Sequence, residues 1–433
     1  MVYPTETTTT TNFAVPCTIN TYGNAWDGNL TFGVFEYNPA NASQIVHSYL
    51  VVMKTDGELL NLKEYDDPQG DYGITKYINS DTIMYQGAPG VTTHFWNLDT
   101  NQTTDFPEVT GYHHDIDYDP ATGDFLTLGH DFRIVNGSNV LYDTINEYNA
   151  TGAVLWTWDT YDYLPFSWNN PLIPTTTYNG ETAIDFTHCN AIQWDFAENV
   201  CYLNSRSLDT FWKINMTTGD IIWGCGLHGN FTLLDASGNV VSSLWYGCHD
   251  PEEIAPDVFI MFNNDYMNLT NPNDDRSSIL EVTLNEQNMT AKETWSWEAP
   301  ADYYSAFWGK ADVLPNGDAI GTFGPPTKPY NSSIGAVLVE VNPQGKVVRT
   351  WTFPAGWGIY RVVEQGIVPN SLGIYPEPEI MQVASSGGFD LRPVAIVVTI
   401  VAIVALVSIL MLRRRKNSGK QTRAQFQDKP ARL

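Results

Sequence analysis

The sequence predicts an all-β protein: a six-bladed β-propeller followed by a stalk and one C-terminal transmembrane helix. Two repeated strand patterns and one long apolar run in the 433-residue chain lead to this prediction. In the first pattern, an apolar or aromatic strand passes through a polar turn into a second strand that often ends in Trp. It occurs at 50–65, 145–158, 211–226, 279–297 and 337–353, with a weaker copy at 94–106. β-Branched and aromatic runs around Asp-Gly, Thr-Gly or Gln-Gly turns are typical of β-hairpins.

A second hairpin pattern lies between copies of the first, at 116–129, 192–205, 254–264 and 313–324. Two hairpins per unit make a four-stranded sheet, and six such units fit into residues 21–368. Radial repetition of these sheets hides their edges, as in a β-propeller. A pair of β-sandwiches is the alternative, which the Trp-ended repeat disfavours. We therefore expect an N-terminal segment at 1–20, the propeller at 21–368 and a juxtamembrane stalk at 369–393.

Residues 394–412 form an uncharged run of 19 residues that is followed directly by Arg413, Arg414, Arg415 and Lys416. This length and this cationic flank predict a membrane-spanning helix with a basic cytoplasmic tail at 413–433. The first residues have neither the basic start nor the apolar stretch of a signal peptide. A tail-anchored protein with a cytosolic domain is therefore one interpretation.

The domain before the span favours the opposite orientation, because it is acidic and rich in glycosylation sequons. It contains ten Asn-x-Ser/Thr triplets, at Asn29, Asn41, Asn101, Asn136, Asn149, Asn215, Asn230, Asn268, Asn288 and Asn331. We expect a single-pass type I membrane protein with an extracellular or lumenal propeller, whose signal lies upstream of Met1 or is missing from this sequence.

The composition excludes several classes of protein. The chain is 43% hydrophobic and only 16% charged, with 14 Trp, 23 Tyr and 19 Phe, so it has the material for a core and is not disordered. Its net charge of −27 excludes a general nucleic-acid binder. Five cysteines predict one or two disulfide bridges in an oxidising compartment, and without a Cys-x-x-Cys pair a structural zinc site has little support.

Histidines carry the strongest signal for a site. Three of them stand in short polar segments just before a second-pattern hairpin, at 112–116, 187–192 and 247–252. His113 and His249 each lie seven residues before a proline, Pro120 and Pro256. Phe196 stands at the corresponding position after His188, and the spacing there is one residue longer. Because equivalent positions of a propeller point at one axis, these segments are expected to converge on a central funnel.

These segments resemble the arylsulfotransferase (aryl-sulfate sulfotransferase) family. The resemblance rests on HHDIDYDP, WTWDTYDYLP, DFTHCNAI, LNSRSLD, TGDIIW and WYGCHDPEEI, and covers residues 111–324 best. It implies a six-bladed propeller that moves a sulfuryl group from a phenolic sulfate ester to a phenolic acceptor. This transfer needs no PAPS and no other cofactor, and it follows a ping-pong route through a sulfated histidine.

The resemblance also implies roles for individual residues. His249 matches the nucleophile, and His188, Asn190 and Arg206 match residues that bind the sulfuryl group. A further family histidine, the general acid and base, matches either His113 or His114. This chain reads Ser205-Arg206-Ser207 where the family often has Ser-Arg-His.

The chemistry is physically consistent with these residues. A guanidinium binds two sulfate oxygens at once, Asn190 and a protonated His188 can supply further donors, and His249 has to attack as a neutral ring. Tyr112 and Tyr246 are candidates for stacking on the aryl group. Because the domain before the tail is acidic, its funnel must be locally positive to accept an anionic donor.

Two other functions remain open from the sequence. One is a non-catalytic extracellular binding or adhesion propeller. The other is a metal-dependent propeller lyase or hydrolase that uses the same histidines as ligands. We expect the protein to have no metal site. A Cys225–Cys248 bridge is one way in which the loop that carries His249 could be held.

Overall fold

The computed structural model describes residues 7–38, 41–64, 75–87, 92–266, 276–324 and 334–365. The chain divides into two units, Met1–Val383 and Ala384–Leu433. The expected stalk at 369–393, span at 394–412 and tail at 413–433 lie outside the described residues. None of the helices in the described ranges is long and apolar enough to cross a membrane.

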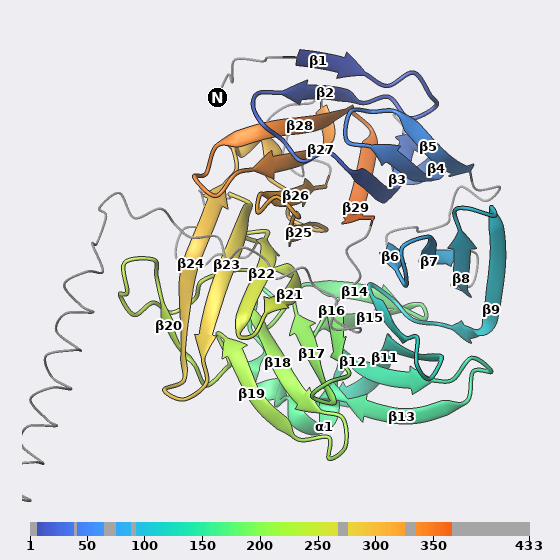
Figure 1. Ribbon diagram of the computed structural model, residues 1–433. Coiled ribbons are helices and arrows are strands. Elements are labelled where there is room, and N and C mark those ends of the chain that lie inside the picture. The colour runs from blue at the N-terminus through green and yellow to red at the C-terminus, as the bar shows by residue number, and fades with distance from the viewer. Residues whose placement is uncertain are drawn as a thin grey trace, which may run out of the picture. The chain divides into compact units, whose positions relative to one another are not determined.

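The described part of the first unit is nearly all β, and its strands form six sheets (Figure 1). The first sheet contains β3 (Asn29–Asn38), β4 (Asn41–Lys54), β5 (Leu59–Glu64) and the late strand β29 (Trp357–Glu364). The second contains β6 (Thr75–Tyr77), β7 (Thr82–Gly87), β8 (Thr92–Asn97) and β9 (Gln102–Thr110). The third contains β10 (Ile116–Asp119), β11 (Asp124–Val135), β12 (Ser138–Tyr148), β13 (Val154–Asp159), β14 (Thr175–Tyr178) and β15 (Glu181–Asp185).

The other three sheets follow in chain order. The fourth contains β16 (Cys189–Asp195), β17 (Val200–Ser205), β18 (Thr210–Asn215) and β19 (Ile221–Gly226). The fifth contains β20 (Thr232–Leu234), β21 (His249–Ala255), β22 (Val258–Asn263), β23 (Ser278–Asn285) and β24 (Thr290–Glu298). The sixth contains β25 (Lys310–Val313), β26 (Ala319–Phe323), β27 (Ile334–Val341) and β28 (Val347–Pro354), with β2 (Thr18–Thr21) and β1 (Thr7–Thr10) added at its edge. The described helices are short: α1 (Thr160–Tyr163) and two 3₁₀ turns, Phe166–Trp168 and Ala301–Tyr303.

Both predicted hairpin patterns are present in these sheets. The Trp-ended pattern forms the outer strands, such as β18 with β19 and β27 with β28, and the second pattern forms inner hairpins such as β10 with β11 and β25 with β26. The Thr-rich strand β14 and the short strands β15 and β20 were not expected. β15 pairs in parallel with β12 and antiparallel with β14, β20 pairs in parallel with β24, and these pairings extend the two sheets beyond four strands.

Apolar side chains are buried between neighbouring sheets, and this positions the sheets. One cluster joins Leu128 and Tyr142 of the third sheet to Ile192 of the fourth, and another joins Phe211 of the fourth to Phe259 of the fifth. Further clusters link the fifth sheet to the sixth, the first to the second and the second to the third. The cluster that joins the sixth sheet to the first contains residues from both ends of the described chain, including Ile19 and Ile359.

Two strand pairings join the beginning of the described chain to its end. β29 runs antiparallel to β3, and β2 runs antiparallel to β28, with Thr18 opposite Thr352 (Figure 1). Residues 7–21 therefore belong to the sixth sheet rather than to a separate N-terminal segment.

The expected disulfide bridges are absent, because all five cysteines are unpaired and buried. Cys225 and Cys248 lie in one apolar cluster with Phe211 and Trp245, where their thiols act as small core side chains. Burial also raises the pKa of both thiols above its usual value, which disfavours the reactive thiolate.

Candidate active site

The inner strands begin at residues with an unusual backbone. His114, His188, Asp250 and Trp308 have positive φ angles of 59°, 41°, 52° and 63°, at or just before the starts of β10, β16, β21 and β25. A non-glycine residue in this left-handed region carries strain, and such strain concentrates at functional sites. Three of these four positions fall in the histidine segments that the sequence indicates.

His249 is buried, and its neighbours fix which ring nitrogen carries the hydrogen. Nδ1 lies 2.7 Å from Asn264 Oδ1, and the backbone N–H of Trp308 donates to Nε2 over 3.3 Å. The Asn264 amide has one possible orientation, because its Nδ2 donates to the carbonyl oxygens of Ser305 and Trp308, each at 2.8 Å. Asn264 Oδ1 must therefore accept, so His249 carries the hydrogen on Nδ1 and keeps a lone pair on Nε2.

The electrostatic surroundings keep the His249 ring neutral. Burial, and then the positive charge of Arg206, hold the pKa of His249 well below its usual 6.5. A neutral ring with its lone pair on Nε2 is the form that a nucleophilic histidine needs.

Arg206 is buried and forms no ion pair with any described residue. Its Nη2 donates to the backbone oxygen of Ala306 over 2.9 Å, and its guanidinium lies 4.4 Å above the ring of Tyr266. Its Nε is buried and has no hydrogen-bond partner in the described part of the chain. Asp185 and Asp209 act on its charge only from beyond ion-pair distance. A buried cation without a counter-ion in direct contact is costly, so this position fits a site that an anion occupies during function.

His188 stands between His249 and the histidine pair before β10. Its Nδ1 donates to Asp185 Oδ2 over 2.5 Å, which leaves Nε2 for another partner. Its ring contacts the His114 ring at a centroid distance of 4.9 Å. The ring of Tyr360 lies 6.3 Å from His114 and 6.1 Å from His249, and so connects the two sides of the site.

The other histidine of the pair, His113, lies behind His114 and faces Asp143. The Nδ1 atoms of His113 and His114 are 2.7 Å apart, and His113 Nε2 is 3.2 Å from Asp143 Oδ1. His130 stacks on His113 with ring centroids 3.8 Å apart, and its Nδ1 lies 3.1 Å from the same oxygen of Asp143. In the described part of the chain, His113, His130 and Asp143 are also the group whose ligand atoms could hold a metal ion. The histidines expected to act together in that role, His113, His188 and His249, are not such a group.

The remaining predicted site residues have mainly structural contacts. Asn190 is fully buried, and its Nδ2 donates to the carbonyl oxygen of Cys248 over 3.0 Å, so it positions the backbone that precedes His249. Tyr112 is buried in an apolar cluster, and its hydroxyl lies 2.9 Å from Thr93 Oγ1, which leaves no face for an aryl substrate. Tyr246 is half-buried next to the His249 segment.

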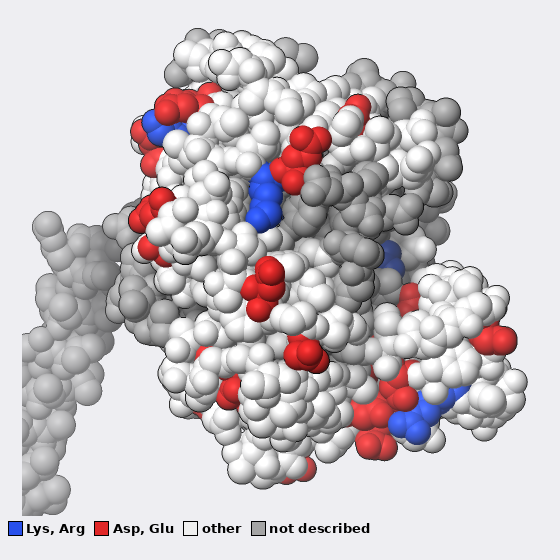
Figure 2. Space-filling model, turned by 90° about the vertical axis from the view of Figure 1, so that its right-hand side faces the viewer, with Lys and Arg blue, Asp and Glu red and all other residues white. Residues whose placement is uncertain are grey.

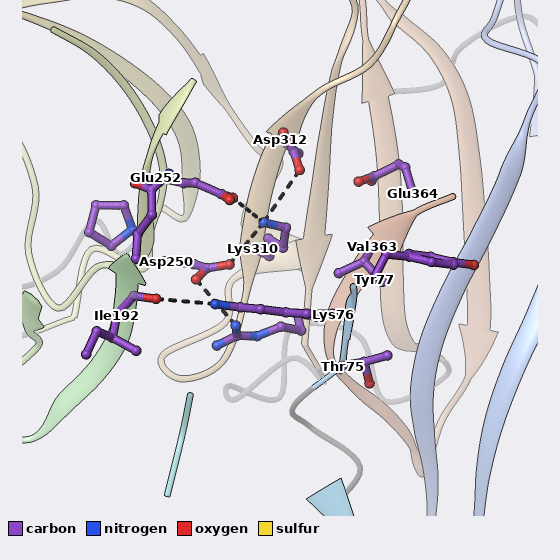
Figure 3. Close-up of a pocket in the computed structure, with 13 residues that line it drawn as sticks. Thr75, Lys76, Tyr77, Ile192, Asp250, Glu252, Lys310, Asp312, Val363 and Glu364 are labelled. Carbon is purple, nitrogen blue, oxygen red and sulfur yellow. Dashed lines mark hydrogen bonds and ion pairs between the residues drawn. The ribbon is translucent and has the colours of Figure 1, made fainter. Parts of the chain in front are cut away.

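A cavity lies beside this site, where five inner strands meet (Figure 3). It is lined by Thr75, Lys76 and Tyr77 of β6, Ile192 and Gln193 of β16, Asp250, Pro251 and Glu252 of β21, Lys310 and Asp312 of β25, and Arg361, Val363 and Glu364 of β29. Figure 3 shows Lys310 among three carboxylates; its Nζ is 2.6 Å from Glu252, 3.2 Å from Asp250 and 3.5 Å from Asp312.

Arg361 links this cavity to the histidines. Its Nη1 lies 3.0 Å from Asp115 and 3.4 Å from Asp250, and its Nη2 donates to the carbonyl oxygen of His114 over 3.2 Å. The chain neighbours of His114 and His249 are therefore held by one guanidinium. Burial raises the pKa of Asp312 to about 6 and the pKa of Glu364 well above its usual value, which reduces the negative charge of the cavity.

Sequence reasoning missed four residues that shape the site: Asn264, Asp143, Tyr360 and Arg361. Asp143 carried a usable signal, because a carboxylate within the apolar strand VLYDTI needs a buried partner. Arg361 carried the same kind of signal, because it is a charged residue within the apolar strand GIYRVV. Figure 2 shows scattered Lys, Arg, Asp and Glu side chains on one face of the molecule. The charged residues that shape this site, among them Arg206, Asp143 and Arg361, are buried.

One comparison with known proteins identifies a family for most of the chain. Residues 40–361 match the family model described as arylsulfotransferase (ASST). No curated protein is significantly similar to the chain.

Several solved structures share the β-rich architecture at low similarity. TolB from Acinetobacter baumannii is 10% identical with a TM-score of 0.43, and the match covers 78% of this chain and 66% of TolB. The periplasmic gluconolactonase PpgL from Pseudomonas aeruginosa is 7% identical with a TM-score of 0.42, over 78% of this chain and all of that one (100%). The Cps50 (Swd1) β-propeller domain from Myceliophteria thermophila is 10% identical with a TM-score of 0.37, over 77% and 89% of the two chains. These low similarities carry no functional inference.

Proposed function

The chain belongs to the arylsulfotransferase (ASST) family, and on that premise we propose that it transfers a sulfuryl group from a phenolic sulfate ester to a phenolic acceptor through a sulfohistidine at His249. Family membership supports aryl sulfotransferase activity in general, with a phenolic sulfate donor and a phenolic acceptor. The ping-pong route, its independence of PAPS and the individual residue roles are our proposal.

One observation carries this proposal. A neutral histidine with its lone pair on Nε2 lies near a buried arginine that forms no ion pair with a described residue, although the charges of Asp185 and Asp209 act on it from further away. The arginine supplies charge for the sulfate oxygens, and the lone pair supplies a nucleophile for the sulfur. Sulfuryl transfer resembles phosphoryl transfer, in which positioning and charge stabilisation account for most of the catalysis.

In the first half-reaction, the hydrogen bond from the Trp308 N–H to His249 Nε2 breaks, and the freed Nε2 lone pair attacks the sulfur of the donor. The N–S bond forms while the S–O bond to the aryl group breaks, and the phenolic oxygen leaves with the bonding electron pair. This oxygen takes a proton from the histidine pair, His113 and His114, which enters this half-reaction carrying the proton that an acceptor phenol left in the preceding turnover. Arg206 and His188 stabilise the sulfuryl oxygens, whose negative charge is spread over the transition state.

In the second half-reaction, the acceptor phenol returns a proton to the same histidine pair. Its oxygen attacks the sulfur, the N–S bond breaks, and the electron pair returns to His249 Nε2. Tyr246 is the aromatic residue that we propose beside the aryl ring, because Tyr112 is held in the core.

The architecture and location belong to the same proposal. We interpret the six sheets as the blades of a propeller, which is supported by apolar clusters that join each sheet to the next and the last to the first. We also propose that residues 394–412 span a membrane, with the propeller outside the cytoplasm and the basic tail inside. The charge pattern of the sequence and its sequons support this orientation.

The first test uses the full-length protein with 4-nitrophenyl sulfate as donor, with and without phenol and without added PAPS. We expect rapid release of one equivalent of nitrophenolate without acceptor, steady turnover with phenol, and a His249 peptide that is heavier by one SO₃ group. His249→Ala should lose all three signals. His47→Ala, which removes an exposed histidine of β4, is the matched control and should keep them.

Two results would contradict the proposal. Turnover that survives in His249→Ala would show that another residue is the nucleophile. Absence of release, turnover and labelling in a correctly folded wild-type protein would favour a binding propeller instead.

A further inference from the structure

We propose that Asp143, His113 and His114 form a proton relay, in which His114 Nε2 exchanges the proton with the phenolic oxygen and Asp143 balances the charge that this proton brings. The relay deepens the proposed function and rests on it. It also assigns separate roles to two adjacent histidines, with His114 as the catalytic residue and His113 as the residue that passes the proton on.

The hydrogen-bond partners fix the resting state of the relay. His113 Nε2 faces two acceptors, Asp143 Oδ1 at 3.2 Å and the carbonyl oxygen of Gly129 at 3.3 Å, so it carries a hydrogen. In the neutral ring, His113 Nδ1 then has a lone pair and accepts the hydrogen of His114 Nδ1 across 2.7 Å. His114 Nε2 is consequently unprotonated, and it has no hydrogen bond to any residue that the structure describes. His114 Nε2 is therefore the atom of the relay that is available to a substrate.

An incoming proton can pass through the pair while only one of the two rings carries a positive charge at any time. When a phenol gives its proton to His114 Nε2, the N–H bond at His114 Nδ1 breaks and a new N–H bond forms at His113 Nδ1. His114 is then neutral again, now with its hydrogen on Nε2, and the positive charge lies on His113 beside Asp143. The donor half-reaction starts from this protonated pair, which the preceding acceptor half-reaction leaves, and not from the neutral resting pair. The reverse shift then gives the extra proton to the departing phenolate.

The contacts favour charge on His113 over charge on His114, because of the two rings it is His113 that lies 3.2 Å from the Asp143 carboxylate, although burial lowers the pKa of His113 as well. Burial, and then the rings of His188, His113 and His249, hold the pKa of His114 well below its usual 6.5. Asp143 supplies the compensating charge. Burial raises the pKa of Asp143, but the hydrogen bonds from His113 and His130 outweigh this effect and hold the pKa well below its usual value. Its other oxygen, Oδ2, accepts from Thr187 Oγ1 and from the backbone N–H of Cys189, each at 2.6 Å.

The strand register places the carboxylate where the relay needs it. Asp143 of β12 lies directly opposite His130 of β11, and the cross-strand hydrogen bond between them leaves Asp143 Oδ1 facing His113 as well. His113 itself is anchored by its backbone N–H, which donates to the carbonyl oxygen of Leu128 over 2.9 Å. The relay therefore joins strand β12 to the loop before β10.

A bound metal is the competing occupant of the same atoms. His113 Nε2, His130 Nδ1 and Asp143 Oδ1 are close enough to ligate one ion. A ligating Nε2 has no hydrogen, so His113 could not receive its charge next to a free carboxylate. The two arrangements predict different results for the substitution Asp143→Asn.

The first experiment reads the ring tautomers and does not depend on activity. In Asp143→Asn the amide oxygen must take the Oδ2 position, because the Cys189 N–H needs an acceptor there. The amide NH₂ then faces His113 Nε2, which reverses the hydrogen bonds along the pair and moves the His114 hydrogen from Nδ1 to Nε2. Full-length protein labelled with ¹⁵N-histidine should show this exchange by NMR, with the His114 Nε2 resonance changing from the unprotonated to the protonated type.

The second experiment compares two donors that differ in leaving group. Phenolate is a stronger base than 4-nitrophenolate and needs the proton more. Asp143→Asn should lower kcat/KM for phenyl sulfate by about 10²- to 10⁴-fold, and for 4-nitrophenyl sulfate by no more than about tenfold. Asp105→Asn is the matched control, because it breaks a similar His–Asp pair on the surface, between His94 and Asp105 at 2.7 Å, and should change neither value.

Each outcome decides the relay separately from the proposed function. An unchanged His114 tautomer in Asp143→Asn, or equal losses for both donors in a variant that melts like the wild type, would overturn the relay while leaving the sulfotransferase intact. One equivalent of metal in the wild type that disappears in Asp143→Asn would overturn it in favour of the metal site. A wild type with no turnover would refute the proposed function, and the NMR result would still decide whether the proton chain exists.

Discussion

Asn264 determines which ring nitrogen of His249 carries the hydrogen, because its own amide can be oriented in only one way. Two backbone carbonyls accept from its NH₂ group, so its oxygen faces His249. The amide is neutral, unlike the carboxylate that orients the histidine of a Ser-His-Asp triad. A neutral partner fixes the tautomer without favouring the imidazolium, which suits a histidine that must attack the sulfur itself.

Asn264→Ala should therefore lower kcat by about 10²-fold while changing KM little, since the sulfate ligand Arg206 is untouched. The measurement is the rate of sulfuryl transfer between pH 5 and pH 8. In the wild type the pKa of His249 lies below 6.5, so the ring stays neutral and the rate persists as the pH falls through 6.5. In the variant the rate should be low across the whole range. A normal rate in Asn264→Ala would show that Trp308 N–H alone orients the ring.

The sequence predicted His249, His188 and Arg206 because each lies in a short motif that can be read locally. Asn264 lies 15 residues after His249, just beyond β22, and Asp143 lies 30 residues after His113, in β12. Such contacts depend on strand register, which a single sequence does not specify. For the same reason, Tyr112 was expected in the site, although its position on the strand entrance turns its ring into the core.

At the scale of elements, the alternation of apolar and polar residues and the Gly-containing turns predicted the hairpins but not every strand. The pattern at 337–353 became β27 and β28, where Leu338, Trp351 and Phe353 point into the core beside the first sheet. β14, which is rich in Thr and lies at the edge of its sheet, has no buried residue, and β15 buries only Ala183 and Asp185, so neither strand shows apolar alternation. Strands without a buried face have no periodic signal to read.

β29 is the element whose core contribution can be tested most directly. Ile359 of β29 is fully buried opposite Val34 of β3 in the cluster that joins the sixth sheet to the first. Ile359→Ala should lower the free energy of unfolding by about 2–5 kcal/mol, because it removes buried methyl groups and leaves a cavity. Ile134→Ala in β11 is the control, since that side chain is 72% exposed and should change stability by less than about 0.5 kcal/mol. Equal effects in urea denaturation would show that β29 does not pack as described.

At the scale of the whole molecule, the beginning and end of the described chain are held together, and the site depends on this connection. β29 pairs with β3 and also provides Arg361, which bridges the segments of His114 and His249, and Tyr360, which contacts both rings. The repeat pattern predicted how many hairpin pairs to expect, but it did not predict that a late strand would complete the first sheet. That pairing is between residues more than 300 positions apart.

Two truncations of the full chain test this connection and the proposed membrane anchor together. A chain that ends at Val383 keeps every described strand, so it should melt at the wild-type temperature, and it should move from the membrane fraction to the soluble fraction because it lacks residues 394–412. A chain that ends at Gly356 lacks β29, exposes the edge of β3 and leaves Asp115 without Arg361. It should show no cooperative unfolding and no transfer activity.

If the chain ending at Val383 stayed with membranes after an alkaline wash, the anchor would lie elsewhere. If the chain ending at Gly356 unfolded cooperatively and transferred sulfate, then β29 would be an accessory strand, and Arg361 would not be needed to hold the two histidine segments together.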